Sequence, residues 1–284
     1  MKILISLLLF AITHLIAADI TLVPYIAKTS YDKVPKKSSL IGGIYANYIE
    51  DDYVIEMGYE NLKLDYNSTS AVKDLNQDDF VLSYSQLVTP SKKIKGAFHY
   101  ILSNNKQSDN AKVIFVDLQH FKKNKFDIGL ELAYSSYDKS AVADDVRQAK
   151  LYYGMTFGDY KSTMGRYIVK IGATMISSEY TDSNSSLDTT LNSYDLSITQ
   201  HKGNFTNKLT WWDGDRLNAV KDDAFTVQNL NELYTTGLTL STKYAIDRDM
   251  GLIVSYSKES FLDLDVNIKD KSERFLFSFS YIFR

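Results

Sequence analysis

Cysteine is absent from this 284-residue chain, and proline occurs only three times. Without cysteine, the chain can form neither a disulfide framework nor a lipidated cysteine behind a signal segment, which excludes a lipoprotein. The formal net charge is only −3, so no bulk attraction to nucleic acid is expected. After residue 18, no apolar run approaches the ~18 residues that a membrane-spanning helix requires. The sequence therefore excludes a helical membrane protein beyond its first residues.

Residues 1–18 have the features of a secretory signal peptide. Lys2 supplies the positive charge, Ile3 to Ile12 form a short apolar run, and Ala17 and Ala18 provide small residues for cleavage. Cleavage after either alanine fits this pattern, and the alternative is an uncleaved N-terminal anchor. The sequence predicts a signal peptide over 1–18 and a single β domain over 19–284.

Apolar and polar residues alternate in many separate segments of the chain. The 21 tyrosines and 14 phenylalanines favour strands, because aromatic rings suit a pleated, half-buried surface. Alternation of period two, as in 94–102, 126–134, 149–157 and 167–175, predicts strands with one apolar face. Thirteen such segments are clear, and residues 19–28, although they contain Pro24, supply a fourteenth. We expect about fourteen strands, with twelve or sixteen as alternatives.

The connections between these segments alternate between short and long along the chain. This layout is typical of a membrane β-barrel with short turns at one end and longer loops at the other. A Greek-key sandwich would break the regularity. The short connections lie near 50–52, 90–92, 122–124, 158–160, 202–204 and 247–249, and the long ones near 29–38, 67–78, 104–110, 138–146, 180–188, 214–230 and 261–272.

The last twelve residues, Glu273–Arg284, carry the strongest single signal. Every second position is aromatic, namely Phe275, Phe277, Phe279, Tyr281 and Phe283. This strand resembles the C-terminal assembly signal of Gram-negative outer-membrane barrels, which favours an aromatic final residue. Phe283 fits that pattern, and Arg284 follows it.

The whole pattern over 19–284 resembles the small monomeric fourteen-stranded porins, without a motif specific to one family. The resemblance implies an all-β, transmembrane, antiparallel up-and-down β-barrel in the outer membrane of a Gram-negative bacterium. It also implies contact with outer-membrane lipid, lipopolysaccharide and the outer-membrane assembly machinery.

If the apolar rows face lipid, the intervening residues line the lumen. The acids among them come mostly from the first half of the chain and the bases mostly from the second half. Acids would then face bases across the lumen and create a transverse field. The alternative is that these charges pair between neighbouring strands. The charged residues expected to line the pore are Glu56, Glu60, Lys95, Asp117, Asp127, Glu131, Lys150, Arg166, Lys170, Asp195, Lys208, Lys243 and Arg274.

Aromatic residues at or near the strand ends predict the interfacial girdles of a membrane barrel. They are Tyr53, Tyr59, Phe80, Tyr100, Phe126, Tyr134, Phe157, Tyr167, Tyr234, Tyr244, Tyr256 and Phe283.

Residues that carry catalysis are scarce, so we expect no enzyme, no cofactor and no metal site. Nucleophile-elbow, metalloprotease-helix and phosphate-loop motifs are missing. The acidic stretches 263–267 and 213–215 do not complete a calcium loop and are expected to be solvated.

The sequence predicts a channel for passive diffusion of small hydrophilic solutes. One alternative is a structural or surface-binding barrel with a filled lumen, in which 180–188 and 214–230 contact a partner. A third is an enzyme at the barrel rim, which would need His120 or His201 beside a carboxylate or serine.

Overall fold

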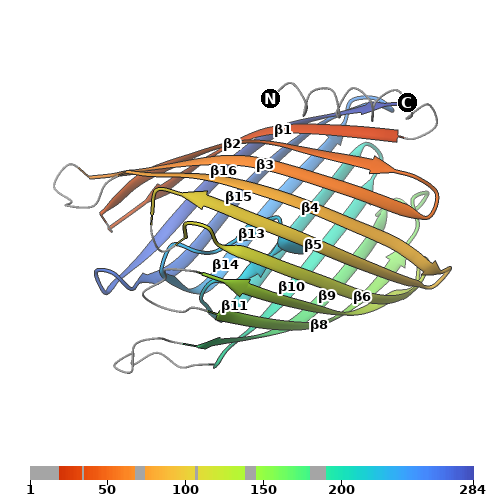
Figure 1. Ribbon diagram of the computed structural model, residues 1–284. Helices are drawn as coiled ribbons and strands as arrows, with labels where there is room; N and C mark the ends of the chain where they lie inside the picture. The colour runs from red at the N-terminus through yellow and green to blue at the C-terminus, as the bar shows by residue number, and fades with distance from the viewer. Residues whose placement is uncertain (1–18, 34, 68–73, 106–107, 138–144, 180–189) are drawn as a thin grey trace, which may run out of the picture.

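The chain folds into a closed barrel of fourteen antiparallel strands, which confirms the predicted fold class and strand number. The computed structural model describes residues 19–284 except 34, 68–73, 106–107, 138–144 and 180–189. The predicted signal at 1–18 lies outside the described residues. The barrel strands, which tilt around a common axis (Figure 1), are β1 (Asp19–Tyr31), β2 (Lys36–Ile49), β3 (Tyr53–Tyr66), β4 (Leu75–Thr89), β5 (Lys92–Ser103), β6 (Lys112–Lys122), β7 (Phe126–Ser136), β8 (Asp145–Gly158), β9 (Arg166–Glu179), β10 (Thr190–Lys202), β11 (Phe205–Arg216), β14 (Glu232–Ala245), β15 (Met250–Asp263) and β16 (Ile268–Phe283).

Large apolar side chains cover the outside of this barrel. Along β4, buried and exposed residues alternate, and the exposed set includes Phe80, Leu82 and Tyr84. Phe275 on β16 is 60% exposed, and Leu151 on β8 is 59% exposed. A continuous apolar outer surface would be unfavourable in water, so this wall faces lipid. No helix within the described part of the chain is long and apolar enough to cross a membrane.

The barrel closes by pairing of the first and last strands. The register runs from Ile20 opposite Phe283 to Tyr31 opposite Ser272. The pairing is interrupted near Pro24, which has no N–H to donate. There Ser278 Oγ donates a hydrogen bond of 3.0 Å to the carbonyl oxygen of Pro24. The strand expected at 19–28 is therefore present, and proline is accommodated at the seam.

The two ends of the barrel differ in their connections. We call the end that holds 50–52, 90–91, 123–125, 159–165, 203–204 and 246–249 the turn end, and the opposite end the loop end. Two loops expected to be long are short, because β1, β2, β15 and β16 extend further than their apolar alternation indicates. The connection predicted at 29–38 is 32–35, and the one predicted at 261–272 is 264–267.

The connection between β11 and β14, residues 217–231, folds back into the lumen. It contains β12 (Val220–Lys221), the short 3-10 helix η1 (Asp222–Ala224) and β13 (Thr226–Val227). Figure 1 shows β13 within the ring of barrel strands rather than beyond its end. We call this segment the inner hairpin. The surface loop expected at 214–230 is thus an internal element.

Tyr234 was predicted in the outer aromatic girdle, and this prediction is wrong. Its side chain is 9% exposed and packs inside the barrel with Trp212 and Phe261. The pairing of β14 with both neighbours shifts register between Tyr234 and Thr236. One extra residue in a strand reverses the faces of all residues beyond it, so Tyr234 points inward although Leu238 and Leu240 point outward.

Candidate functional site

The tip of the inner hairpin has an unusual backbone. Asp222, Asp223 and Ala224 have φ values of 50°, 57° and 71°. Side chains with a Cβ are disfavoured in this left-handed region, by roughly 1–2 kcal/mol per residue. Three such residues in succession require external contacts to hold them. At the hairpin base, Asn218 and Asn231 also have positive φ, which asparagine tolerates better than most residues.

Apolar packing fixes one face of the inner hairpin against the barrel wall. Leu217 and Ala219 belong to one buried cluster, and Val220 and Ala224 to a second. Inward-facing apolar side chains of β5 to β10 complete both clusters, among them Ile101, Val113, Phe115, Ala133, Val146, Ile176 and Leu191. A wet lumen would not favour these residues at inward positions. This departure from polar-in alternation is the sequence signal that an internal element covers this side.

Polar contacts hold the hairpin at three points on the same wall. Gln148 Nε2 donates to Val220 O at 2.7 Å, and Val220 N donates to Gln148 Oε1 at 3.0 Å. His99 Nδ1 lies 2.7 Å from Ala224 O, and its Nε2 lies 3.1 Å from Asp79 Oδ1. Lys95 Nζ lies 2.8 Å from Asp223 Oδ2 and 2.5 Å from Glu56 Oε2. These contacts constrain the left-handed tip directly.

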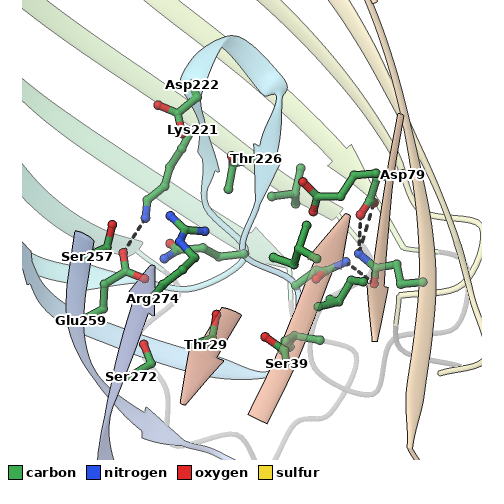
Figure 2. Close-up of a pocket in the computed structure, with 18 of the residues that line it drawn as sticks. Thr29, Ser39, Asp79, Lys221, Asp222, Thr226, Ser257, Glu259, Ser272 and Arg274 are labelled. Carbon is green, nitrogen blue, oxygen red and sulfur yellow. Dashed lines mark hydrogen bonds and ion pairs between the residues drawn. The ribbon is translucent and has the colours of Figure 1, made fainter. Parts of the chain in front are cut away.

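The opposite side of the hairpin reaches β15. Lys221 Nζ lies 2.9 Å from Glu259 Oε1, and Figure 2 shows the two side chains extended toward each other. Phe225 packs edge-on against the ring of Tyr45 on β2, with ring centroids 5.4 Å apart. The hairpin is therefore braced across the lumen.

A buried charge cluster anchors the hairpin where it returns to the wall. Lys36 Nζ lies 2.8 Å from Glu232 Oε1 and 2.9 Å from Asp263 Oδ2, and all three side chains are at most 3% exposed. Tyr234 also donates a hydrogen bond to Glu232. Since Glu232 begins β14 directly after the hairpin, this cluster fixes the loop-end base of the inserted segment.

Three cavities surround the inner hairpin, with volumes of about 130, 430 and 480 Å³. The 130 Å³ cavity includes Thr29, Ser39, Ser257 and Ser272 (Figure 2). All three share Asp222 on the hairpin tip and Arg274 on β16. One acid and one base therefore line every one of these three cavities.

The structure distributes the thirteen predicted pore-lining residues among the cavities and the wall. Glu131, Lys150, Lys170, Asp195, Lys208 and Arg274 line the 480 Å³ cavity. Glu56, Glu60, Lys95 and again Arg274 line the 430 Å³ cavity. Asp117 accepts hydrogen bonds from Tyr152, Arg166 donates to Tyr160 at the turn end, and Lys243 lies beside Gly251.

Several predicted charges pair along the wall. Lys170 Nζ lies 2.7 Å from Asp127 Oδ2, and Lys150 Nζ lies 3.3 Å from Asp195 Oδ1. By contrast, Lys208, Lys243 and Arg274 have no carboxylate within 4.0 Å among the described residues. Sequence reasoning missed Lys221, Asp222, Asp223 and Glu259 as site residues, because three of them belong to a segment expected at the surface.

The histidines considered for a rim enzyme have other neighbours. His201 Nδ1 lies 3.0 Å from Thr206 Oγ1, and its ring lies near Tyr160. The ring of His120 lies near that of Phe126. Asp263, from one of the acidic stretches, pairs with Lys36. Within the described residues, no group of three His, Cys, Asp or Glu side chains is arranged to hold a metal.

Comparison with known proteins yields similar structures only. No family model matches the chain, and no curated protein matches its sequence. A bacterial polysaccharide outer membrane secretin has a TM-score of 0.57 at 8% identity, covering 93% of this chain and 98% of its own. The CymD monoaromatic hydrocarbon channel has a TM-score of 0.52 at 9% identity, covering 93% of this chain and 87% of its own. The Acinetobacter baumannii outer membrane protein Omp33 has a TM-score of 0.50 at 9% identity, and the alignment covers 93% of this chain and 99% of Omp33. At these identities, the likeness shows a shared β-barrel fold.

Proposed function

We propose that this protein is an outer-membrane channel through which small hydrophilic solutes diffuse passively. The observation that carries the proposal is that three cavities in the lumen all have Asp222 and Arg274 among their lining residues. An acid and a base at one constriction present both signs of charge to a passing solute, which orients polar molecules and limits their size.

The inner hairpin is the size-limiting element in this proposal. Its apolar face packs against the wall of β5 to β10, whereas Lys221 and Asp222 line the remaining space together with residues of β15 and β16. Lys208, which has no carboxylate within 4.0 Å among the described residues, adds a positive charge to the lining of the 480 Å³ cavity. The lipid-facing wall and the fold of the similar structures support an outer-membrane location.

The proposal is tested by recording currents from the purified protein in planar lipid bilayers. We expect stepwise conductance increments, and a larger increment when residues 219–229 are replaced by a short glycine-serine turn. Neutralising Lys150, Lys170 and Lys208 together to glutamine should shift selectivity toward cations. A properly folded barrel without conductance, both intact and with the hairpin shortened, would reject the channel and favour a structural barrel with a filled lumen.

A further inference from the structure

Five lysines lie on the outer wall toward the loop end, spread along three adjacent strands and one connection. Lys28 lies on β1, Lys258 on β15, Lys269 and Lys271 on β16, and Lys33 in the connection 32–35. All five are exposed, and on β16 they alternate with the buried, inward-facing Asp270 and Ser272. We call these five residues the lysine patch. On β3 and β6, the outward positions near the loop end carry one lysine each, Lys63 and Lys112.

Three of the five patch lysines border a groove of about 280 Å³, which Asp32 and Asp270 also line. Lys33, Lys269 and Lys271 line it, together with Leu262 and Thr235. The backbone at its edge is fixed, because the N–H groups of Asp32 and Lys33 donate to the Asp270 carboxylate at 3.0–3.3 Å. The groove is therefore built on ordered strands and a tethered connection.

The positive charge of the patch is only partly neutralised by the protein. Lys258 Nζ lies 2.5 Å from Glu273 Oε1. Lys28, Lys269 and Lys271 have no carboxylate within 4.0 Å anywhere in the described chain. Asp270, which lines the groove, is engaged by backbone N–H groups. Three or more ammonium groups remain available to an external anion.

On the turn-end side of the lysine patch, strands β1, β15 and β16 carry apolar side chains on their outer face. Lys28 pairs in register with Phe275, whose ring centroid lies 4.8 Å from that of Tyr256. Ile26 and Phe277 follow at the next outward positions and are about half exposed. Cations at the edge of an apolar wall match an amphipathic molecule with an anionic head and apolar chains.

We propose that the lysine patch binds the headgroup of an outer-leaflet lipid that carries two phosphates, with its acyl chains along Phe275 and Phe277. Lysine ammonium groups are strong donors to phosphate oxygens, and a charge-assisted contact at the membrane surface is stronger than one in bulk water. A clustered diphosphate matches several unpaired lysines better than a single phosphate does. The proposal requires a lipid-facing outer wall whose loop end lies at the outer leaflet, and it is independent of conductance.

Binding of diphosphorylated lipid A to the purified full-length protein in detergent tests this site, with native mass spectrometry as the readout. Replacing Lys28, Lys269 and Lys271 together with glutamine should weaken binding by about ten-fold or more, since each lysine at a membrane surface contributes separately. Lys122, Lys123 and Lys125, exposed at the turn end, give a matched triple replacement that should leave binding unchanged. If the patch triple variant fails to fold, as judged by its heat-dependent gel migration, Lys271→Gln alone serves, with about three-fold weaker binding expected.

Three outcomes would overturn the proposal. One is equal binding of fully dephosphorylated lipid A, which would assign the interaction to the acyl chains. Another is an equal effect of the patch and turn-end replacements, which would assign it to net charge. The third is binding of inorganic pyrophosphate as tightly as the lipid, which would make the groove a site for a free anion.

Discussion

Lys95 on β5 joins the inner hairpin to the barrel, with its ammonium nitrogen 2.8 Å from the Asp223 carboxylate at the hairpin tip. The Lys95 side chain is 5% exposed, whereas that of Asp223 is 45% exposed. The Asp223 carboxylate at the hairpin tip is thus partly exposed to the lumen and is held in place by a buried cation. This contact links the left-handed conformation of η1 to the barrel wall.

Lys95→Met should loosen the hairpin without removing apolar packing. Glu56 and Asp223 lose their common partner, so we expect the free energy of unfolding to fall by about 1–3 kcal/mol, with the solvated Asp223 contributing least. Single-channel records should also show more frequent current fluctuations. Urea unfolding in detergent measures the first effect and planar-bilayer recording the second. Lys208→Met removes the same charge without breaking an ion pair, and similar behaviour of both variants would contradict this role for Lys95.

Asp222→Asn and Arg274→Gln should change ion selectivity in opposite directions. The first removes a negative charge from the lining of all three cavities and favours anions, and the second removes a positive charge from the same lining and favours cations. One unit charge a few ångströms from a solvated ion is worth about 1 kcal/mol, or a permeability ratio changed about five-fold. Reversal potentials in a KCl gradient measure this. The effect should fade at 1 M salt, where screening acts over about 3 Å. Shifts of the same sign would contradict the proposed constriction.

Lys36→Met should be strongly destabilising, because it leaves Glu232 and Asp263 buried without their cation. Loss of one partner from a buried ion cluster costs about 3–5 kcal/mol. Lys258→Met breaks the exposed pair with Glu273 and should cost less than about 1 kcal/mol. Denaturant unfolding of both variants gives the comparison. Adding Glu232→Gln and Asp263→Asn to Lys36→Met should recover most of the loss, and no recovery would place the defect in packing rather than in charge.

Gly58→Val should push Phe225, and with it the adjacent hairpin tip, away from β3. A Cβ at Gly58 would lie 3.1 Å from the Phe225 ring, which is closer than ordinary contact. We expect lower conductance and a loss of about 1–3 kcal/mol from overpacking. Gly42 has no atom within 4 Å of an added Cβ, so Gly42→Val is the matched control. Unchanged conductance in Gly58→Val would show that the tip is not size-limiting.

Alternation of side chains made most of the wall predictable. Because a strand sends successive residues to opposite faces, the rows 126–134 and 275–283 identified lipid-facing strands without any tertiary information. The same rule assigned Lys150 and Lys208 to the lumen side. It misplaced Tyr234, since Tyr234 continues the even-numbered spacing of Leu238 and Leu240 across a bulge that reverses the faces of the strand.

The inner hairpin was not predictable in the same way. Residues 217–231 are polar and irregular enough to read as a surface loop, and their direction depends on contacts with residues distant in the chain. The inward-facing side chains of Ile101, Val113 and Phe115 are buried by packing against the hairpin. Gln148 and His99 form hydrogen bonds with the hairpin backbone. Only the closed barrel brings these groups to one side of the lumen.

The amino-acid sequence alone determined the β class, the number of strands, the apolar outer wall and the closure of Glu273–Arg284 on the first strand. These depend on local periodicity and on the need to pair every strand edge in a membrane. The tertiary structure decided the route through the lumen. Asp222 and Arg274 are far apart in the chain and line the same cavities only because burial of the hairpin's apolar face fixes the position of the hairpin in the lumen.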